Sequence, residues 1–205
     1  AKFDGKWNKE VPDPYAIATG INGSRTAILS LAGTHPQGWE QDERPRPVEA
    51  VDAIIYELHV RDASIHSSSG IQHKGKFPGL AEYGTQNSHG QSTGLDHIKE
   101  LGVTHVHLLP FFDFLSIDET QPDSAQYNWG YEPLNYNVPE GSYSTLPQDP
   151  GARIRELKQM VLNFHKKDLR VVMDVVYNHT MLTEDSWFNQ LVPDYFYRQD
   201  SNGRF

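Results

Sequence analysis

The chain of 205 residues contains no cysteine, and this absence removes several kinds of site at once. Without a thiol there is no disulfide framework, no thiolate metal site and no cysteine nucleophile. No apolar run approaches the roughly 20 residues that a membrane-spanning helix needs. The net charge is −9, and this acidic balance argues against nucleic acid as the main partner.

Further absences concern known sequence motifs and the start of the chain. The sequence has no HExxH, P-loop or GxSxG motif and no repeat of solenoid period. It begins with Ala1 rather than Met and shows no signal peptide, so we expect the native start to lie elsewhere. The lack of cysteine fits a secreted bacterial protein, and we favour an extracellular or cell-surface location over a cytoplasmic one.

The most informative segment that is present covers residues 170–179. It is an apolar, β-branched run that breaks into Asp174, Asn178 and His179. A parallel strand that helices cover on both faces is apolar throughout. A carboxylate, an amide and an imidazole at its carboxyl end are costly unless a site uses them. The segment therefore indicates an enzyme.

From residue 53 onward, the chain alternates between strand and helix patterns. We predict helices over 95–101 and 152–167, the second with Asp149 near its N-cap, and strands over 53–62, 103–109 and 170–179. The loops after strands, 63–91 and 111–149, are long, whereas those after helices are short. This asymmetry is typical of a (β/α)₈ barrel. A doubly wound sheet alternates in the same way, but its glycine-rich turn is missing here.

The barrel predicted in this way is incomplete. Residues 1–47 are rich in Gly and Pro, include a predicted strand at 27–31 and end in a polar linker, so we place a domain boundary between 47 and 48. Residues 48–205 supply only about three of the eight strand–helix units of this α/β fold. Three strands cannot close a barrel. We expect the remainder of the barrel in the same parent protein or in a second polypeptide.

Several residues are candidates for chemistry. Asp174 would be buried and needs a partner, for which Arg61 is one candidate; a structural role in a core network is the alternative. His179 could donate a hydrogen bond to a hydroxyl-rich ligand, or merely cap a helix or loop. The loop 127–133 interleaves aromatic rings with amides, which suits a sugar, although such a loop could also pack its own rings.

Other polar residues are expected to be structural. His105 and His107 share a strand face at a spacing that could chelate a metal, but no third ligand has clear spacing. We therefore expect core or rim histidines. Glu57 and His59 are expected in the barrel interior.

Three segments resemble one family. Asp174-Val175-Val176-Tyr177-Asn178-His179 is similar to the D-x-x-x-N-H motif that ends the third barrel strand in the α-amylase family of glycoside hydrolases. Residues 127–133, Tyr-Asn-Trp-Gly-Tyr-Glu-Pro, resemble the signature of type I pullulanases, as does the segment 55–62. The resemblance covers about residues 3–205. It implies that 1–47 are the end of a β-sandwich carbohydrate-binding module.

This resemblance implies hydrolysis, with retention, of α-1,6-glucosidic bonds in pullulan and branched starch or glycogen fragments. The family's Asp nucleophile, Glu acid/base and third Asp follow later strands. We therefore expect no catalytic carboxylate in this chain and an inactive isolated fragment. Four acidic residues lie too early and lack the expected context, namely Glu184, Asp185, Asp194 and Asp200.

The resemblance also implies roles within one sugar subsite. His179 should bind the 6-hydroxyl of the sugar at subsite −1, Tyr131 should stack on its ring, and Asn128 and Trp129 should shape the neighbouring wall. Asp174 should orient the strand that carries the nucleophile.

No cofactor is expected to be required. Asn178 corresponds to a calcium ligand in many α-amylases, so the resemblance makes Ca²⁺ the candidate metal ion. The sequence does not otherwise define a metal. Two alternatives compete: an isoamylase or branching-type member of the family, and a non-catalytic carbohydrate-binding fragment.

Overall fold

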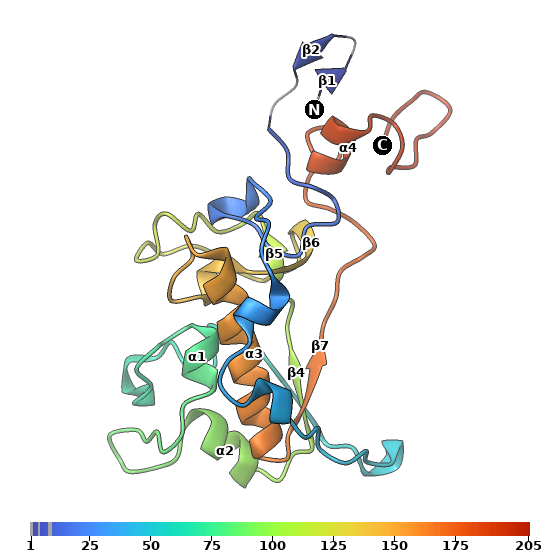
Figure 1. Ribbon diagram of the computed structural model, residues 1–205. Coiled ribbons are helices and arrows are strands. Elements are labelled where there is room, and N and C mark those ends of the chain that lie inside the picture. The colour runs from blue at the N-terminus through green and yellow to red at the C-terminus, as the bar shows by residue number, and fades with distance from the viewer. Residues whose placement is uncertain (1, 4, 8–9) are drawn as a thin grey trace.

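Three parallel strands form the centre of the molecule (Figure 1). The computed structural model describes residues 2–3, 5–7 and 10–205. The strands β3 (Ile55–Leu58), β4 (His105–Leu108) and β7 (Arg170–Met173) lie in the order β3-β4-β7. Their register sets Glu57 beside His107, and His107 beside Val172. The predicted parallel α/β core is confirmed, with strands shorter than the patterns suggested.

Two helices match their predicted positions. Helix α2 spans Gly94–Glu100 and is followed by Gly102, whose φ of 73° lies in the left-handed region that glycine adopts at helix ends. Helix α3 spans Pro150–Lys166 and begins after Asp149, whose side chain accepts a hydrogen bond of 2.8 Å from the Gly151 amide. Both helices pack apolar faces toward the sheet.

One continuous core lies between the strands and the helices. Val106 and Leu108 of β4, Met160 and Phe164 of α3, and Leu95 of α2 are fully buried in it. Helix α3 contacts both β7 and the short helix α1 (Phe77–Leu80). The sheet is therefore held from one side by helices, as a βα unit requires.

The two long loops contain structure that the sequence analysis did not predict. Helix α1 and a 3₁₀ turn at Ser67–Ser69 interrupt 63–91. Strands β5 (Phe112–Phe114) and β6 (Pro133–Pro139) pair antiparallel within 111–149. The prediction of plain loops was wrong here because β5 is buried along its whole length and β6 has proline at both ends, so neither shows the usual alternation.

The amino-terminal part differs from its prediction in one element. Strands β1 (Lys2–Phe3) and β2 (Lys6–Trp7) form a two-stranded sheet, but the strand expected at 27–31 is absent. Leu31–Thr34 is a 3₁₀ helix, and Ile28 is fully exposed, so no apolar face of a strand is buried there. The β-sandwich assignment and the boundary at 47 stay predictions.

Residues 20–46 nevertheless lie against the barrel portion. Arg153 of α3 donates to the Gly20 carbonyl oxygen at 3.1 Å, and His165 Nδ1 lies 2.8 Å from Asp42 Oδ2. Arg170 Nε donates to the Arg46 carbonyl oxygen at 2.8 Å. These contacts connect the segment to α3 and β7.

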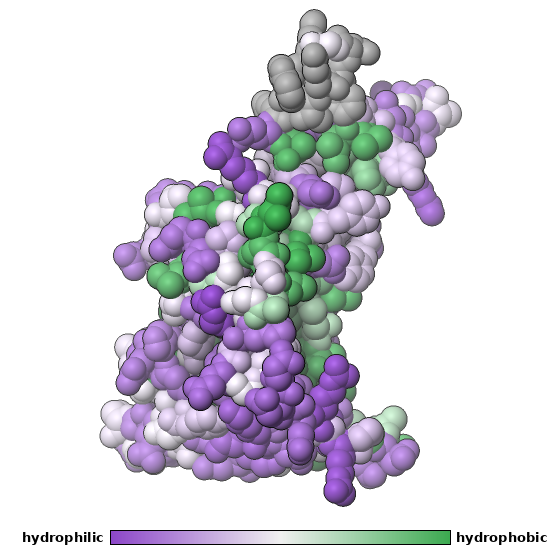
Figure 2. Space-filling view, viewed as in Figure 1, coloured by the Kyte–Doolittle hydropathy of each residue, from purple (hydrophilic) through white to green (hydrophobic). Residues whose placement is uncertain are grey.

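Helix α4 (Trp187–Leu191) precedes an irregular carboxyl-terminal segment and is distant from the three-stranded sheet in Figure 1. Beside β7, an apolar groove of about 690 Å³ is lined by Leu157, Val161, Val171 and Met173 among others. Figure 2 shows a largely hydrophilic lower part and apolar residues gathered above it. In the described part of the chain, no helix combines the length and apolarity that a membrane span demands.

Candidate active site

The carboxyl ends of the three parallel strands bring a row of polar side chains together. His107 of β4 lies between Glu57 of β3 and Asp174, which directly follows β7. His107 Nδ1 is 3.7 Å from Glu57 Oε2, and its Nε2 is 3.9 Å from Asp174 Oδ2. The Asp174 amide extends the sheet by donating to the Leu108 carbonyl oxygen at 3.0 Å. Loops after parallel strands meet at this end, where α/β enzymes place their sites.

Tyr131 connects the loop after β4 to the segment after β7. Its hydroxyl donates to Asp174 Oδ2 at 2.6 Å, and its backbone carbonyl oxygen lies 2.9 Å from His179 Nε2. Three residues from the two resembling motifs are therefore in direct contact. They form a continuous polar wall, called here the Tyr131–Asp174–His179 wall.

The hydrogen bonds of His179 define its tautomer. Because the Tyr131 carbonyl oxygen can only accept, His179 Nε2 carries the proton and donates. His179 Nδ1 then accepts from the Asn178 side-chain amide at 2.9 Å. Tyr136 of β6 also donates its hydroxyl to the His179 carbonyl oxygen at 2.7 Å. Two neighbours thus orient the imidazole and a third fixes the backbone of His179, although the residue itself is exposed.

The loop 127–133 alternates between exposed rings and anchored positions. Tyr127 and Trp129 are 74% and 55% exposed, and the Trp129 and Tyr131 rings meet edge to face at 5.3 Å. Gly130 between them is buried with φ of 88°, and a Cβ there would lie 2.6 Å from the Pro110 carbonyl oxygen. Only glycine fits this close approach. The loop therefore presents aromatic faces on one side and is fixed on the other.

Asn128 belongs to the anchored side. Its Nδ2 donates to the Tyr143 hydroxyl at 3.0 Å, and that hydroxyl lies 3.1 Å from His59 Nε2. Both Tyr143 and His59 are buried. Tyr143 was not among the predicted site residues, because nothing in the sequence links position 143 to position 59.

The proposed pairing of Arg61 with Asp174 is wrong. Arg61 instead lies 3.2 Å from Asp62 Oδ1, within the turn that follows β3. The partners that the structure gives Asp174 are the Tyr131 phenol and the His107 imidazole. A neutral donor and a neighbouring histidine thus replace the expected guanidinium.

The Tyr131 phenol keeps its proton throughout the neutral range. Burial, the hydrogen bond to Asp174 and the nearby negative charges of Asp174 and Glu57 raise the pKa of Tyr131 to about 12. The phenol consequently remains a hydrogen-bond donor to Asp174 at any pH at which this fold would work. It offers its ring face, not a negative charge, to a neighbour.

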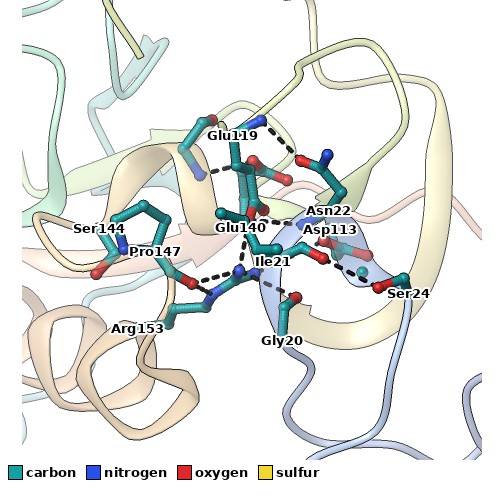
Figure 3. A network of polar contacts seen from close by, with 12 residues as sticks. Gly20, Ile21, Asn22, Ser24, Asp113, Glu119, Glu140, Ser144, Pro147 and Arg153 are labelled. Carbon is teal, nitrogen blue, oxygen red and sulfur yellow. Dashed lines mark hydrogen bonds and ion pairs between the residues drawn. The ribbon is translucent and has the colours of Figure 1, made fainter. Parts of the chain in front are cut away.

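A second polar cluster lies away from this wall, where the amino-terminal segment meets α3 (Figure 3). Asp113, Glu119 and Glu140 are buried with ligand-capable oxygens within 4.8 Å of one another; they are the only three-residue grouping of this kind among the described residues. Arg153 contacts two of them, with Nη2 2.5 Å from Glu119 Oε2 and Nη1 3.8 Å from Asp113 Oδ1.

The chemistry of this cluster favours a proton over a metal ion. The Arg153 guanidinium already supplies its cation, and Glu140 accepts from the Phe114 and Ser142 amides at 3.0 and 2.8 Å. Burial and neighbouring carboxylates raise the pKa of Glu140 to about 8, and burial raises that of Asp113 to about 7. Protons therefore balance the charge that one arginine leaves over.

His105 and His107, expected as core or rim histidines, have separate polar partners in the structure. His105 Nδ1 lies 2.8 Å from Thr104 Oγ1, while His107 faces Glu57 and Asp174. Neither histidine belongs to the acidic grouping.

Comparisons with known proteins follow the same lines as the geometry. The family described as "Alpha amylase, catalytic domain" matches residues 77–203. Pullulanase from Bacillus subtilis is 46% identical over 98% of this chain. The crystal structure of Paenibacillus barengoltzii pullulanase in complex with maltohexaose and α-cyclodextrin superposes with a TM-score of 0.94 at 55% identity over 98% of this chain. Isoamylase 3 from rice is 33% identical over 74% of it.

The chain spans 27% of the Bacillus subtilis relative and 31% of the Paenibacillus barengoltzii chain. Three parallel strands with helices on one side fit a portion of the barrel of these proteins. The chain belongs to the α-amylase family of glycoside hydrolases and, within it, to the type I pullulanases, of whose catalytic domain it forms a part.

Proposed function

We propose that the protein containing this chain hydrolyses α-1,6-glucosidic bonds in pullulan and in branched starch or glycogen fragments, with retention at the anomeric carbon. The observation that carries the proposal is the Tyr131–Asp174–His179 wall. It joins the two family motifs through contacts of 2.6 and 2.9 Å at the carboxyl ends of neighbouring strands. The pullulanase relatives support the choice of bond.

In this proposal the chain recognises the sugar rather than breaking the bond. Tyr131 offers a ring face to the glucose at subsite −1, and the exposed Trp129 beside it shapes the neighbouring wall. His179 binds the 6-hydroxyl of that glucose. Because both ring nitrogens are engaged, the sugar hydroxyl replaces either the Asn178 amide or the Tyr131 carbonyl oxygen.

Asp174 holds a supporting position. Its carboxylate accepts from Tyr131 and faces His107, so it fixes the stacking ring and lines the barrel interior. Retaining hydrolysis needs two carboxyl groups about 5–5.5 Å apart flanking the bond. We place those groups, and the third acidic residue of the family, outside this chain.

The competing assignment is an isoamylase-type debranching enzyme, and the similarity to isoamylase 3 from rice supports it. A non-catalytic carbohydrate-binding role is the further alternative. The loop 127–133 favours the pullulanase assignment, because its residues Tyr-Asn-Trp-Gly-Tyr-Glu-Pro resemble that group's signature.

Product analysis separates these assignments. The complete protein is incubated with pullulan and with amylopectin, and the products are resolved by chromatography. Maltotriose released from pullulan is the expected result. Cleavage of amylopectin branches with pullulan intact would favour the isoamylase assignment, and no cleavage of either would leave only sugar binding. The isolated 205-residue chain, assayed in parallel, should release nothing.

The proposal includes no required cofactor. Hydrolysis should continue unchanged after dialysis against EDTA, because the buried acidic cluster already contains Arg153 as its cation. Bound calcium, if the complete protein holds it at Asn178, would act on stability. We also propose an extracellular or cell-surface location.

A further inference from the structure

His59, Tyr143 and Asn128 form a chain of buried polar contacts that the proposed sugar contacts do not use. It runs from the turn after β3 through the 3₁₀ helix at Gly141–Tyr143 to the loop 127–133. Tyr143 is 1% exposed and His59 8% exposed, so water does not satisfy these groups. A polar group buried in a core is costly unless it is paired, which makes this pairing a feature to explain.

The direction of the chain begins at His59. The Asp62 backbone amide donates to His59 Nδ1 at 3.2 Å, so Nδ1 holds a lone pair. Burial lowers the pKa of His59, which keeps the ring neutral. The proton of the neutral ring is therefore on Nε2, which donates to the Tyr143 hydroxyl 3.1 Å away.

The Tyr143 hydroxyl joins His59 to Asn128. Asn128 Nδ2 donates to this hydroxyl at 3.0 Å, so the hydroxyl accepts hydrogen bonds from both neighbours. The Asn128 side chain also forms a hydrogen bond with His59. Loss of the Tyr143 oxygen would therefore leave Asn128 Nδ2 without its acceptor.

We propose that His59 and Tyr143 are positioning residues that hold Asn128, and through it the sugar-facing loop 127–133, in its binding conformation. Asn128 and Gly130, which contacts Pro110, flank Trp129, so the loop is fixed on both sides of this ring. The rings between and after these points keep the orientation that stacking on a sugar requires. This inference rests on the proposed function of that loop.

Tyr143→Phe is the central test, made in the complete protein. The change removes one oxygen and keeps the ring that packs edge to face on Phe77 and Phe114 at 5.5 and 5.8 Å. We expect kcat/KM on pullulan to fall about 10- to 100-fold at a temperature well below Tm. Tyr83→Phe is the matched control, because its hydroxyl contacts the Asn163 carbonyl oxygen near α3 and should leave kcat/KM unchanged.

A double-mutant cycle distinguishes positioning from general stability. If Tyr143 acts through Asn128, the variant carrying Tyr143→Phe and Asn128→Ala should lose no more than about twice what Asn128→Ala loses alone. His59→Gln, whose amide can replace the Nε2 donor, should retain more activity than His59→Leu. If the losses of kcat/KM in the two single variants multiply in the double variant, or if Tyr143→Phe keeps wild-type kcat/KM, the positioning role of His59 and Tyr143 is overturned.

Failure of the proposed function gives a different result. If the wild-type protein cleaves neither pullulan nor amylopectin, hydrolysis is rejected, and the positioning role is tested by calorimetric titration with maltotriose. Tyr143→Phe should then raise the Kd about tenfold or more, while an unchanged Kd would reject the positioning role. A wild-type protein that does not bind maltotriose would overturn both inferences.

Discussion

At the scale of single residues, the proposed sugar site depends on the two contacts that Tyr131 makes. The same side chain gives its hydroxyl to Asp174 and its ring to the exposed side, beside Trp129. Its pKa of about 12 keeps the hydroxyl a donor, so Asp174 and the ring orientation are coupled at every working pH. Loss of the hydroxyl should therefore affect sugar binding without removing the ring.

Tyr131→Phe tests this coupling. In the complete protein we expect kcat/KM on pullulan to fall about tenfold, because the ring loses its hydrogen bond to Asp174 and is less well oriented. Tyr15→Phe, outside this loop and 89% exposed, should keep wild-type kcat/KM. Equal values for the two variants would show that the contact with Asp174 does not orient the ring.

The sequence identified part of this site and missed part of it. The resemblance to the α-amylase family implied that Tyr131, Asp174 and His179 serve one sugar subsite, and the structure brings the three residues together. Arg61 was one candidate partner for Asp174, but it contacts the adjacent Asp62 instead. Tyr143 was missed because its partner His59 is 84 residues away in sequence.

At the scale of elements, the strength of the local pattern decided what could be predicted. Helix α3 has 17 residues, an amphipathic pattern and a capping aspartate, and its position was correctly predicted. Strands β5 and β6 were missed because tertiary packing, not local alternation, makes them strands. The strand expected at 27–31 failed for the opposite reason, since an apolar run without a neighbouring strand stayed exposed.

The junction of α3, β5 and the amino-terminal segment predicts a pH dependence of stability. Asp113 and Glu140 have raised pKa values of about 7 and 8 in the fold. A raised carboxyl pKa means that the folded state binds more protons than the unfolded one, so the stability that these two groups contribute is fully present below their unfolded pKa values and is lost as pH rises through their folded ones. The facing groups are Glu119 and the Arg153 guanidinium, with Lys76 contributing nearby charge.

We therefore expect the free energy of unfolding to fall by about 2 kcal/mol between pH 6.5 and 8.5. Urea titrations at the two pH values measure it. Glu140→Gln keeps the shape of the side chain and removes one titrating group, so this variant should lose less stability over the same interval. A loss of stability identical to that of the wild-type protein would contradict the raised pKa of Glu140.

At the scale of the whole molecule, the three strands form one wall of a larger structure. Strands β3 and β7 each lack a partner on their outer edge within the described residues, and an apolar groove of about 690 Å³ runs beside β7. These features suit the docking of further strand–helix units, as the lengths of the relatives indicate. The Tyr131–Asp174–His179 wall, which we propose binds the sugar, lies in this chain, whereas we place the groups that break the bond in the remainder of the protein.

The decisive measurement for the proposed sugar-binding role is the kinetics of His179→Ala in the complete protein. The change removes the donor to the Tyr131 carbonyl oxygen and the proposed contact with the sugar hydroxyl. His89→Ala, an exposed histidine in the loop before α2, is the control. We expect kcat/KM on pullulan to fall on the order of 10²-fold in His179→Ala and to stay unchanged in His89→Ala. An unchanged kcat/KM in His179→Ala would contradict the proposed role.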